Sequence, residues 1–147
     1  MADKNMIGTV LGNGSVEIEK GRLRFFAKAI GESDPIYTDE ATARAAGYPA
    51  LPVPPTFLAC MVSETSNVIE RMKVLQMDLG RILHAEQAFD FYRVAYAGDT
   101  LHFETKLSDV YDKKGGALHF AVMETRVTNQ NVEHVADLRG TLVERRG

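Results

Sequence analysis

Two ionisable side chains, His84 and Glu86, stand two residues apart in the second half of the chain. They fall in a segment of alternating polarity, and alternate residues of a strand project from the same face of a sheet. Histidine titrates near neutral pH, so with a carboxylate it can form an acid and base pair. The same spacing also fits a hydrogen-bonded interface pair, or scattered polar positions, with His102 and His119, on exposed strand faces. A chemical role and a structural role are therefore both open for His84 and Glu86.

The residue pattern gives no support to other kinds of site. The four histidines, at positions 84, 102, 119 and 134, lack the tight spacing of metal ligands, so we expect no metal site. The glycine pairs at 12 and 14 and at 115 and 116 match no phosphate-binding or dinucleotide-binding pattern, and no serine stands in a nucleophile elbow. The single cysteine, Cys60, lies in an apolar run and is expected to be a small buried side chain.

The size and charge of the chain indicate one globular domain, residues 1–147, with 45% hydrophobic and 25% charged residues. The net charge of −3 and the short basic pairs at 113–114 and 145–146 exclude a general nucleic-acid binder. No apolar stretch approaches the roughly 18 residues of a membrane span. The start of the chain also lacks the apolar core of a signal peptide. We therefore expect a cytoplasmic protein.

Helical periodicity appears twice in the first third of the chain. Apolar residues recur at helical spacing across residues 19–30. Residues 39–46 fit a second, short helix whose start Thr38 or Asp39 can cap. Four of the five prolines then fall within residues 48–55, which predicts a rigid, extended loop.

A third helix, residues 56–72, is expected directly after this loop. Its first turns are apolar on every side, which is typical of a buried helix. Beyond it the period changes from 3.6 to 2. Four alternating segments, separated by turn residues, predict an antiparallel meander: residues 82–93, 101–111, 118–128 and 134–144. With an early strand within residues 9–18, the chain is expected to form an α+β domain in which a curved sheet wraps a helix.

Several motifs resemble those of the MaoC-like (R)-specific hydratases and dehydratases. Residues 26–37 read Phe-Ala-Lys-Ala-Ile-Gly-Glu-Ser-Asp-Pro-Ile-Tyr, similar to the family's Phe-Ala-x-x-Ser/Thr helix and its Gly-Asp-x-Asn-Pro-Ile-His signature. Residues 97–101, Ala-Gly-Asp-Thr-Leu, match its Gly-Asp turn before a strand. Pro-Pro-Thr-Phe at 54–57 and Leu-His-Ala-Glu-Gln at 83–87 are similar to the FAS1-like branch, which includes substrate-holding subunits of (3R)-hydroxyacyl-thioester dehydratases. The resemblance implies a hot-dog fold, a long central helix wrapped by a curved antiparallel sheet.

The resemblance also implies a catalytic pair that this chain lacks. Catalytic members use an aspartate and a histidine, five residues apart, to act on a bound water. Those positions are Glu32 and Tyr37 here. A tyrosine, with an ordinary pKa of about 10, is a poor base. Glu32 and Tyr37 are thus degenerate dyad positions, and they also fit a helix-ending turn with a packed tyrosine and a solvated glutamate.

The start of the third helix is the second place where the family implies a role. In catalytic members, free N–H groups there polarise the thioester carbonyl. Pro55, Thr56 and Phe57 occupy this position, and Met61 follows one turn later. The resemblance implies substrate binding by these four residues. An ordinary core helix that begins at a proline fits equally well.

From the resemblance we expect a subunit of an (R)-specific 2-enoyl-thioester hydratase or 3-hydroxyacyl-thioester dehydratase. This chain would bind the acyl group, carried as a CoA or acyl-carrier-protein thioester without a further cofactor, in a homodimer or in a heterodimer whose partner hot-dog subunit supplies the Asp/His dyad. Three alternatives stay open. They are a self-sufficient homodimeric hydratase that uses Glu32, Tyr37, His84 and Glu86, a hot-dog thioesterase in which a carboxylate drives hydrolysis, and a non-enzymatic acyl-CoA binder.

Overall fold

The computed structural model describes residues 2–146, so the expected domain extends one residue beyond each described end. Its elements follow in this order: β1 (Val10–Glu17), α1 (Lys20–Ala29), α2 (Glu40–Ala45), α3 (Phe57–Val62), α4 (Val68–Leu75), β2 (Ile82–Phe91), β3 (Thr100–Lys113), β4 (Leu118–Thr128) and β5 (His134–Arg145). Short 3-10 turns lie at Lys4–Met6, Pro35–Tyr37, Leu79–Arg81 and Lys114–Gly116. No helix among the described residues is long and apolar enough to cross a bilayer.

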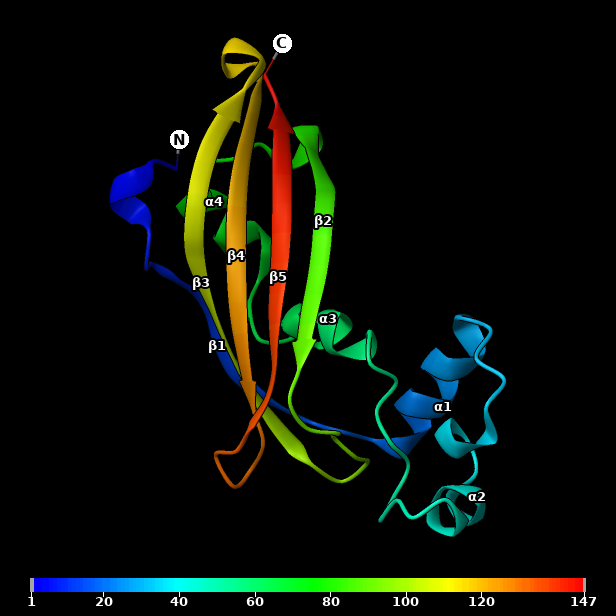
Figure 1. Cartoon of the computed structure of the whole chain (residues 1–147). Coiled ribbons are helices and arrows are strands. Elements are labelled where there is room, and N and C mark those ends of the chain that lie inside the picture. The colour runs from blue at the N-terminus through cyan, green and yellow to red at the C-terminus, as the bar shows by residue number, and fades with distance from the viewer. Residues whose placement is uncertain (1, 147) are drawn as a thin grey trace.

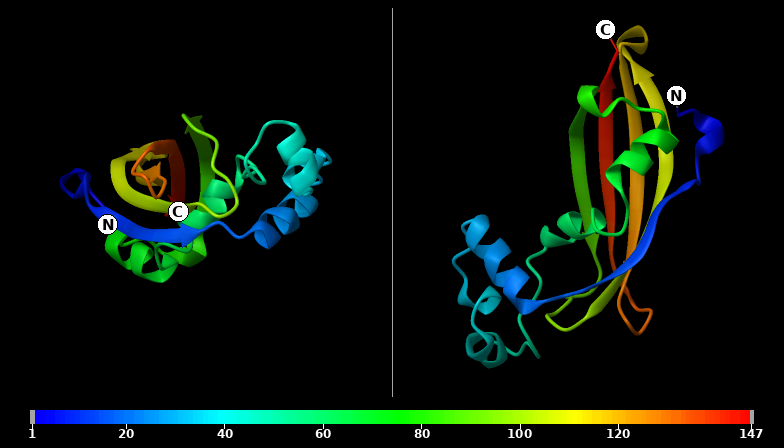
Figure 2. Two further views of the ribbon diagram at one scale, coloured as in Figure 1. Left: turned by 90° about the horizontal axis from the view of Figure 1, so that it is seen from below. Right: turned by 180° about the vertical axis from the view of Figure 1, so that it is seen from behind.

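The five strands form one curved antiparallel sheet in the order β1-β3-β4-β5-β2 (Figure 1). Helices α3 and α4 lie against one face of this sheet, whereas α1 and α2 form a lobe beside its lower end (Figure 2). The α+β arrangement expected from the sequence is confirmed. The predicted meander is confirmed for β3, β4 and β5 only. Strand β2 pairs with β5 and not with β3, because β1 already occupies the other edge of β3.

The expected helix over residues 56–72 is wrong as a single element, because the chain leaves the helical conformation between Val62 and Val68. Asn67 begins α4 as a cap, and its side-chain oxygen accepts hydrogen bonds from the N–H groups of Ile69 and Glu70 at 2.8 and 3.4 Å. The Thr65 hydroxyl donates to the Val62 carbonyl at 2.9 Å, which also competes with a continuous helix.

Two apolar clusters fill the space between the helices and the sheet. One surrounds α3, from which Phe57, Leu58 and Met61 are buried, and the other surrounds α4 through Met72 and Leu75. The expectation of a buried Cys60 is wrong, since this residue is exposed. A short helix beside a sheet buries one side only, and Cys60 lies on the other side of α3.

Candidate functional site

Two cavities lie on either side of α3. The first, called cavity A, has a volume of about 320 Å³ between α3, α4 and the sheet. The helices and the turn after them supply Ala59, Val62, Ser63, Val68, Arg71, Met72 and Leu79, and the sheet supplies Ile82, His84, Gln87, Thr105, Met123, Thr125, Leu138, Gly140 and Leu142. Most of this lining is apolar, as in pockets that take small organic ligands.

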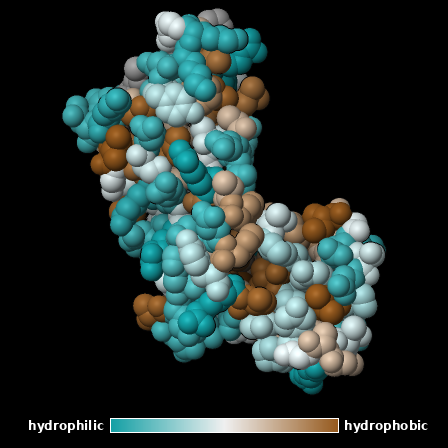
Figure 3. Space-filling model, viewed as in Figure 1, coloured by the Kyte–Doolittle hydropathy of each residue, from teal (hydrophilic) through white to brown (hydrophobic). Residues whose placement is uncertain are grey.

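The second cavity, called cavity B, measures about 380 Å³ and lies where the proline loop meets the segment after β2. It is lined by Tyr37, Tyr48, Pro52, Val53, Pro55, Leu58, Phe91, Tyr92, Arg93, Val94, Ala95 and Val135. Figure 3 shows apolar side chains gathered in the angle between the sheet and the α1–α2 lobe. Leu58 borders cavity B and Ala59 borders cavity A, so α3 separates the two spaces.

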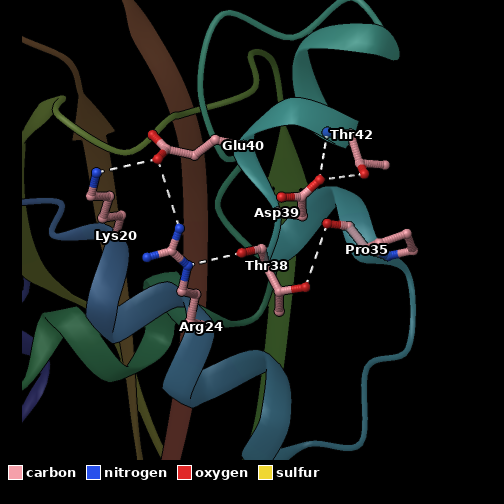
Figure 4. A network of polar contacts seen from close by, with 7 residues as sticks. All are labelled: Lys20, Arg24, Pro35, Thr38, Asp39, Glu40 and Thr42. Carbon is pink, nitrogen blue, oxygen red and sulfur yellow. Dashed lines mark hydrogen bonds and ion pairs between the residues drawn. The ribbon is translucent and has the colours of Figure 1, made fainter.

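A polar network holds the segment with Tyr37 against α1 (Figure 4). The Arg24 guanidinium donates to the Thr38 carbonyl at 2.8 Å and lies 3.7 Å from the Glu40 carboxylate. Asp39 caps α2, because its carboxylate accepts from the Thr42 N–H at 2.8 Å. The hydrogen bonds from Thr42 also lower the pKa of Asp39. Of the two caps that the sequence left open, the structure therefore selects Asp39.

The residues at the family's dyad positions do not form an acid–base pair. Glu32 is exposed, and its carboxylate accepts a hydrogen bond from the Asp34 N–H at 2.9 Å. Tyr37 borders cavity B beside Tyr48. Burial, and then the negative charge of Glu32, raises the pKa of Tyr37. The phenol therefore stays protonated near neutral pH, where it can donate a hydrogen bond but cannot act as a base.

The prediction that His84 and Glu86 share a face is wrong. Strand β2 carries a bulge between them: His84 pairs with Leu142, whereas Glu86 pairs with the adjacent residue, Thr141. The extra residue, Ala85, shifts the alternation, so that His84 lines cavity A while Glu86 lies on the opposite face. There the Glu86 carboxylate accepts from the Thr141 hydroxyl at 3.4 Å.

His84 itself has a defined orientation in the wall of cavity A. Its Nε2 atom lies 2.9 Å from the carbonyl oxygen of Glu86. A carbonyl oxygen only accepts, so Nε2 carries a proton and Nδ1 is left as the acceptor of the neutral ring. The structure thus places His84 next to cavity A and Glu86 on the opposite face of the sheet.

The four residues expected to bind substrate lie in different environments. Pro55 borders cavity B, whereas Thr56 is exposed and borders neither cavity. Phe57 and Met61 are buried in the core and also border neither cavity. The Phe57 ring lies 4.8 Å from the ring of Phe26. The Phe57 N–H donates to the Pro54 carbonyl at 2.9 Å, so this donor is already engaged.

Three polar residues of cavity A were missed by the sequence reasoning, although the patterns contained a signal for each. Arg71 follows Val68 by three residues and precedes Leu75 by four, which places it on the sheet-facing stripe of α4. Thr105 and Thr125 fall in the inward phase of their strands, and both are buried. A polar side chain at an apolar position of a regular pattern marks a candidate site.

Within residues 2–146, no group of three or more histidine, cysteine or acidic side chains is placed to hold a metal ion. Cavity A is a largely apolar space with a few polar side chains in its wall. A curved antiparallel sheet that wraps helices, with such a space between them, is the architecture of a hot-dog domain. Residues 5–138 match the FAS1-like, dehydratase domain region. The chain belongs to this family of MaoC-like hot-dog dehydratase domains.

The chain also has relatives of similar sequence and solved structures of similar fold. The chain is 31% identical over 129 residues to a UPF0336 protein of Saccharopolyspora erythraea, with 88% of this chain and 81% of the relative covered. A UPF0336 protein of Mycobacterium tuberculosis is 34% identical over 112 residues, covering 76% and 66%. The fold is similar to that of the HadBC (3R)-hydroxyacyl-ACP dehydratase complex from Mycobacterium tuberculosis, with a TM-score of 0.80, 22% identity and coverage of 96% and 99%. A MaoC-like dehydratase from Rhodospirillum rubrum gives a TM-score of 0.70 at 21% identity, covering 96% and 93%.

Proposed function

We propose that this chain is the acyl-binding subunit of an (R)-specific 2-enoyl-thioester hydratase or 3-hydroxyacyl-thioester dehydratase. A second hot-dog subunit would supply the aspartate and histidine that activate water. The observation that carries the proposal is the state of the dyad positions: Glu32 is exposed and bonded to the backbone, and the raised pKa of Tyr37 keeps its phenol protonated. Addition of water to a conjugated double bond requires a base for the water. The protonated phenol of Tyr37, at the position of the family's histidine, does not meet that requirement.

The acyl-binding half of the proposal is supported by cavity A. Its volume of about 320 Å³ and its largely apolar wall suit a short hydrocarbon chain. The space lies between the helices and the sheet, so a chain inside it is shielded from water on both sides. Removal of apolar ligand surface from water contributes about 25 cal/mol per Å² to binding.

The partner half of the proposal is supported by the edge strand β2, most of which is exposed. Two apolar side chains on β2 and two just after it are about half exposed, at 57%, 49%, 57% and 52%: Leu83, Phe91, Tyr92 and Val94. An exposed edge with apolar side chains is an aggregation hazard unless another chain covers it. Two structures of similar fold, HadBC and ChsH1-ChsH2, are complexes. A second hot-dog subunit on β2 would cover this edge.

One assay tests the proposal. Hydration of crotonyl-CoA is measured for the chain alone, for a second hot-dog subunit with an intact Gly-Asp-x-Asn-Pro-Ile-His motif alone, and for the two together. We expect little activity from the chain alone and restored turnover in the mixture. Turnover by the isolated chain at about 1–1000 per second, the ordinary range of enzymes, contradicts the proposal. Thioester hydrolysis would favour the thioesterase, and binding without turnover in any pairing would favour the non-enzymatic binder.

A second candidate, a self-sufficient homodimeric hydratase, is favoured by the position of His84. This histidine lines cavity A, and the hydrogen bond from Nε2 leaves Nδ1 as an acceptor in its neutral form. If the isolated chain is active, His84→Gln is expected to abolish turnover. Glu86→Gln is the matched control on the other face of the sheet and is expected to retain it.

A further inference from the structure

A cationic side chain lies in the wall of cavity A without a counter-charge. Arg71 comes from α4, and its Nε atom is buried and makes no hydrogen bond. Among residues 2–146, none forms an ion pair with its guanidinium. Burial lowers the pKa of Arg71, and no neighbouring acid opposes this effect. Arg71 is partly buried, and a charge that is removed from water without an ion-pair partner is stabilised by a ligand group of opposite charge.

Two further polar residues of the lining supply a hydrogen-bond donor. The hydroxyl oxygens of Thr105 and Thr125 lie 2.7 Å apart, so one hydroxyl donates to the other. Each hydroxyl carries one hydrogen, and the pair therefore keeps one hydrogen that it does not use internally. No aspartate or glutamate lines cavity A. A space with a guanidinium, a spare hydroxyl donor and no carboxylate selects a negatively charged oxygen group.

We propose that cavity A binds an acyl chain whose far end carries a carboxylate, with Arg71 as its ion-pair partner. This inference rests on the proposed function and names its substrate class, a thioester of a dicarboxylic acid. The guanidinium matches a carboxylate in geometry, because it offers parallel N–H donors to both oxygens. The apolar side chains of the wall, such as Val62, Met123 and Leu138, accommodate the methylene groups between the two ends. A free inorganic anion would leave that apolar surface uncovered.

A carboxylate from a partner subunit is the other source of negative charge. The position of Arg71 favours the ligand. Its Nε atom is buried within this single chain, and the walls of cavity A in front of it come from the helices and the sheet of the same chain. A partner's side chain would have to enter cavity A to reach it. The experiment below separates the two sources by measuring assembly as well as binding.

The test is direct binding of two matched thioesters to the full chain by calorimetry. Oct-2-enoyl-CoA and oct-2-enedioyl-CoA have the same number of acyl carbons and differ in the terminal carboxylate. We expect the wild type to bind the dicarboxylic ligand about ten-fold or more tightly, since charge-assisted hydrogen bonds are strong in apolar surroundings. Arg71→Met should reduce the difference to about two-fold or less, and Arg71→Lys should retain part of it.

Lys73→Met is the control, because Lys73 lies on the same helix but is exposed and paired with Glu70 at 2.7 Å. It should keep the wild-type preference. Thermal unfolding and sedimentation are recorded for every variant. Arg71→Met is expected to fold with an unchanged oligomeric state and an unfolding temperature close to that of the wild type, because the substitution breaks no ion pair among the described residues.

Three results would overturn the inference. Equal affinity of the wild type for both ligands, or an unchanged preference in Arg71→Met, removes the carboxylate assignment while the proposed function stands. A loss of assembly in Arg71→Met without a change in ligand preference assigns Arg71 to a subunit contact. Failure of both thioesters to bind, to the chain and to its assembly with a dyad-bearing subunit, rejects the proposed function together with the inference.

Discussion

The side-chain hydroxyls of Thr105 and Thr125 face each other directly across strands β3 and β4, 2.7 Å apart in the buried side of the sheet. They are the only pair of buried hydroxyls that the described residues bring into contact within cavity A. One hydroxyl donates to the other, so both take part in a hydrogen bond and are tolerated in a largely apolar wall. The energetic consequence of this pairing can be measured.

Removing one of the two hydroxyls should lower the free energy of unfolding by more than half of the loss caused by removing both. Thr105→Val leaves the Thr125 hydroxyl buried without its partner, and the free energy of unfolding should fall by about 1–2 kcal/mol. Thr125→Val should lower the free energy of unfolding by a similar amount, because it leaves the Thr105 hydroxyl without its partner. In the double valine variant no hydroxyl is left unpaired, so its loss should be smaller than the sum of the two. Urea denaturation of the three variants measures this, and strictly additive losses would show that the pair is not coupled.

Phe57→Ala tests whether the start of α3 belongs to the core or to a binding wall. Phe57 is 5% exposed and packs against Phe26, so we expect a stability loss of about 3–5 kcal/mol. The preference among acyl lengths of the active assembly should not change. Phe25→Ala is the control, because Phe25 is 76% exposed and should cost little. A small stability loss with an altered acyl-length profile would move Phe57 to the binding wall.

Tyr37→Phe tests the assignment of the phenol as a protonated group. Burial and Glu32 raise the pKa of Tyr37, so its ionisation state does not change between about pH 6 and 9. The pH profile of the active assembly should therefore keep its shape in Tyr37→Phe over that range. Tyr48→Phe, in the same wall, is the control. Loss of one limb of the profile in Tyr37→Phe alone would show that this phenol titrates during turnover.

The raised pKa of Tyr37 also makes the stability of the folded chain depend on pH. Above about pH 10 the unfolded chain releases the phenolic proton more readily than the folded chain does, because the folded pKa is raised. The contribution of Tyr37 to stability is therefore present below that pH and declines above it. Urea denaturation at high pH should show a smaller decline in Tyr37→Phe.

A charge on β2 should weaken association. Leu83 is 57% exposed on the edge strand, and Leu83→Asp would place a carboxylate on the surface that we assign to the partner subunit. Sedimentation velocity should show a shift from dimer toward monomer. Val132→Asp is the control: Val132 is 81% exposed in the turn between β4 and β5 and has a φ of 60° that aspartate tolerates better than valine. Equal behaviour of the two variants would remove β2 from the interface.

The sequence by itself determined those features that depend on neighbours along the chain. The periodicity of residues 19–30 predicted α1, and Asp39 was among the two predicted caps of α2. Alternating polarity predicted β2 to β5 within a few residues of their observed bounds, and the apolar residues within 9–18 predicted β1. Hydrogen bonds of a helix and turns of a hairpin close over a few residues, so their signals are local. The family signature at residues 26–37 was readable for the same reason.

Tertiary structure decided what depends on residues far apart. Strand β2 pairs with β5 because β1 and β4 occupy both edges of β3. The residues of β2 alone do not indicate which strand it pairs with. The bulge at Ala85 separates His84 from Glu86, since register is fixed by the partner strand and one extra residue reverses every face. Likewise, the space that collects Arg71 with Thr105 and Thr125 exists only once α4 has packed against β3 and β4, so the polar lining of cavity A arises from long-range contacts.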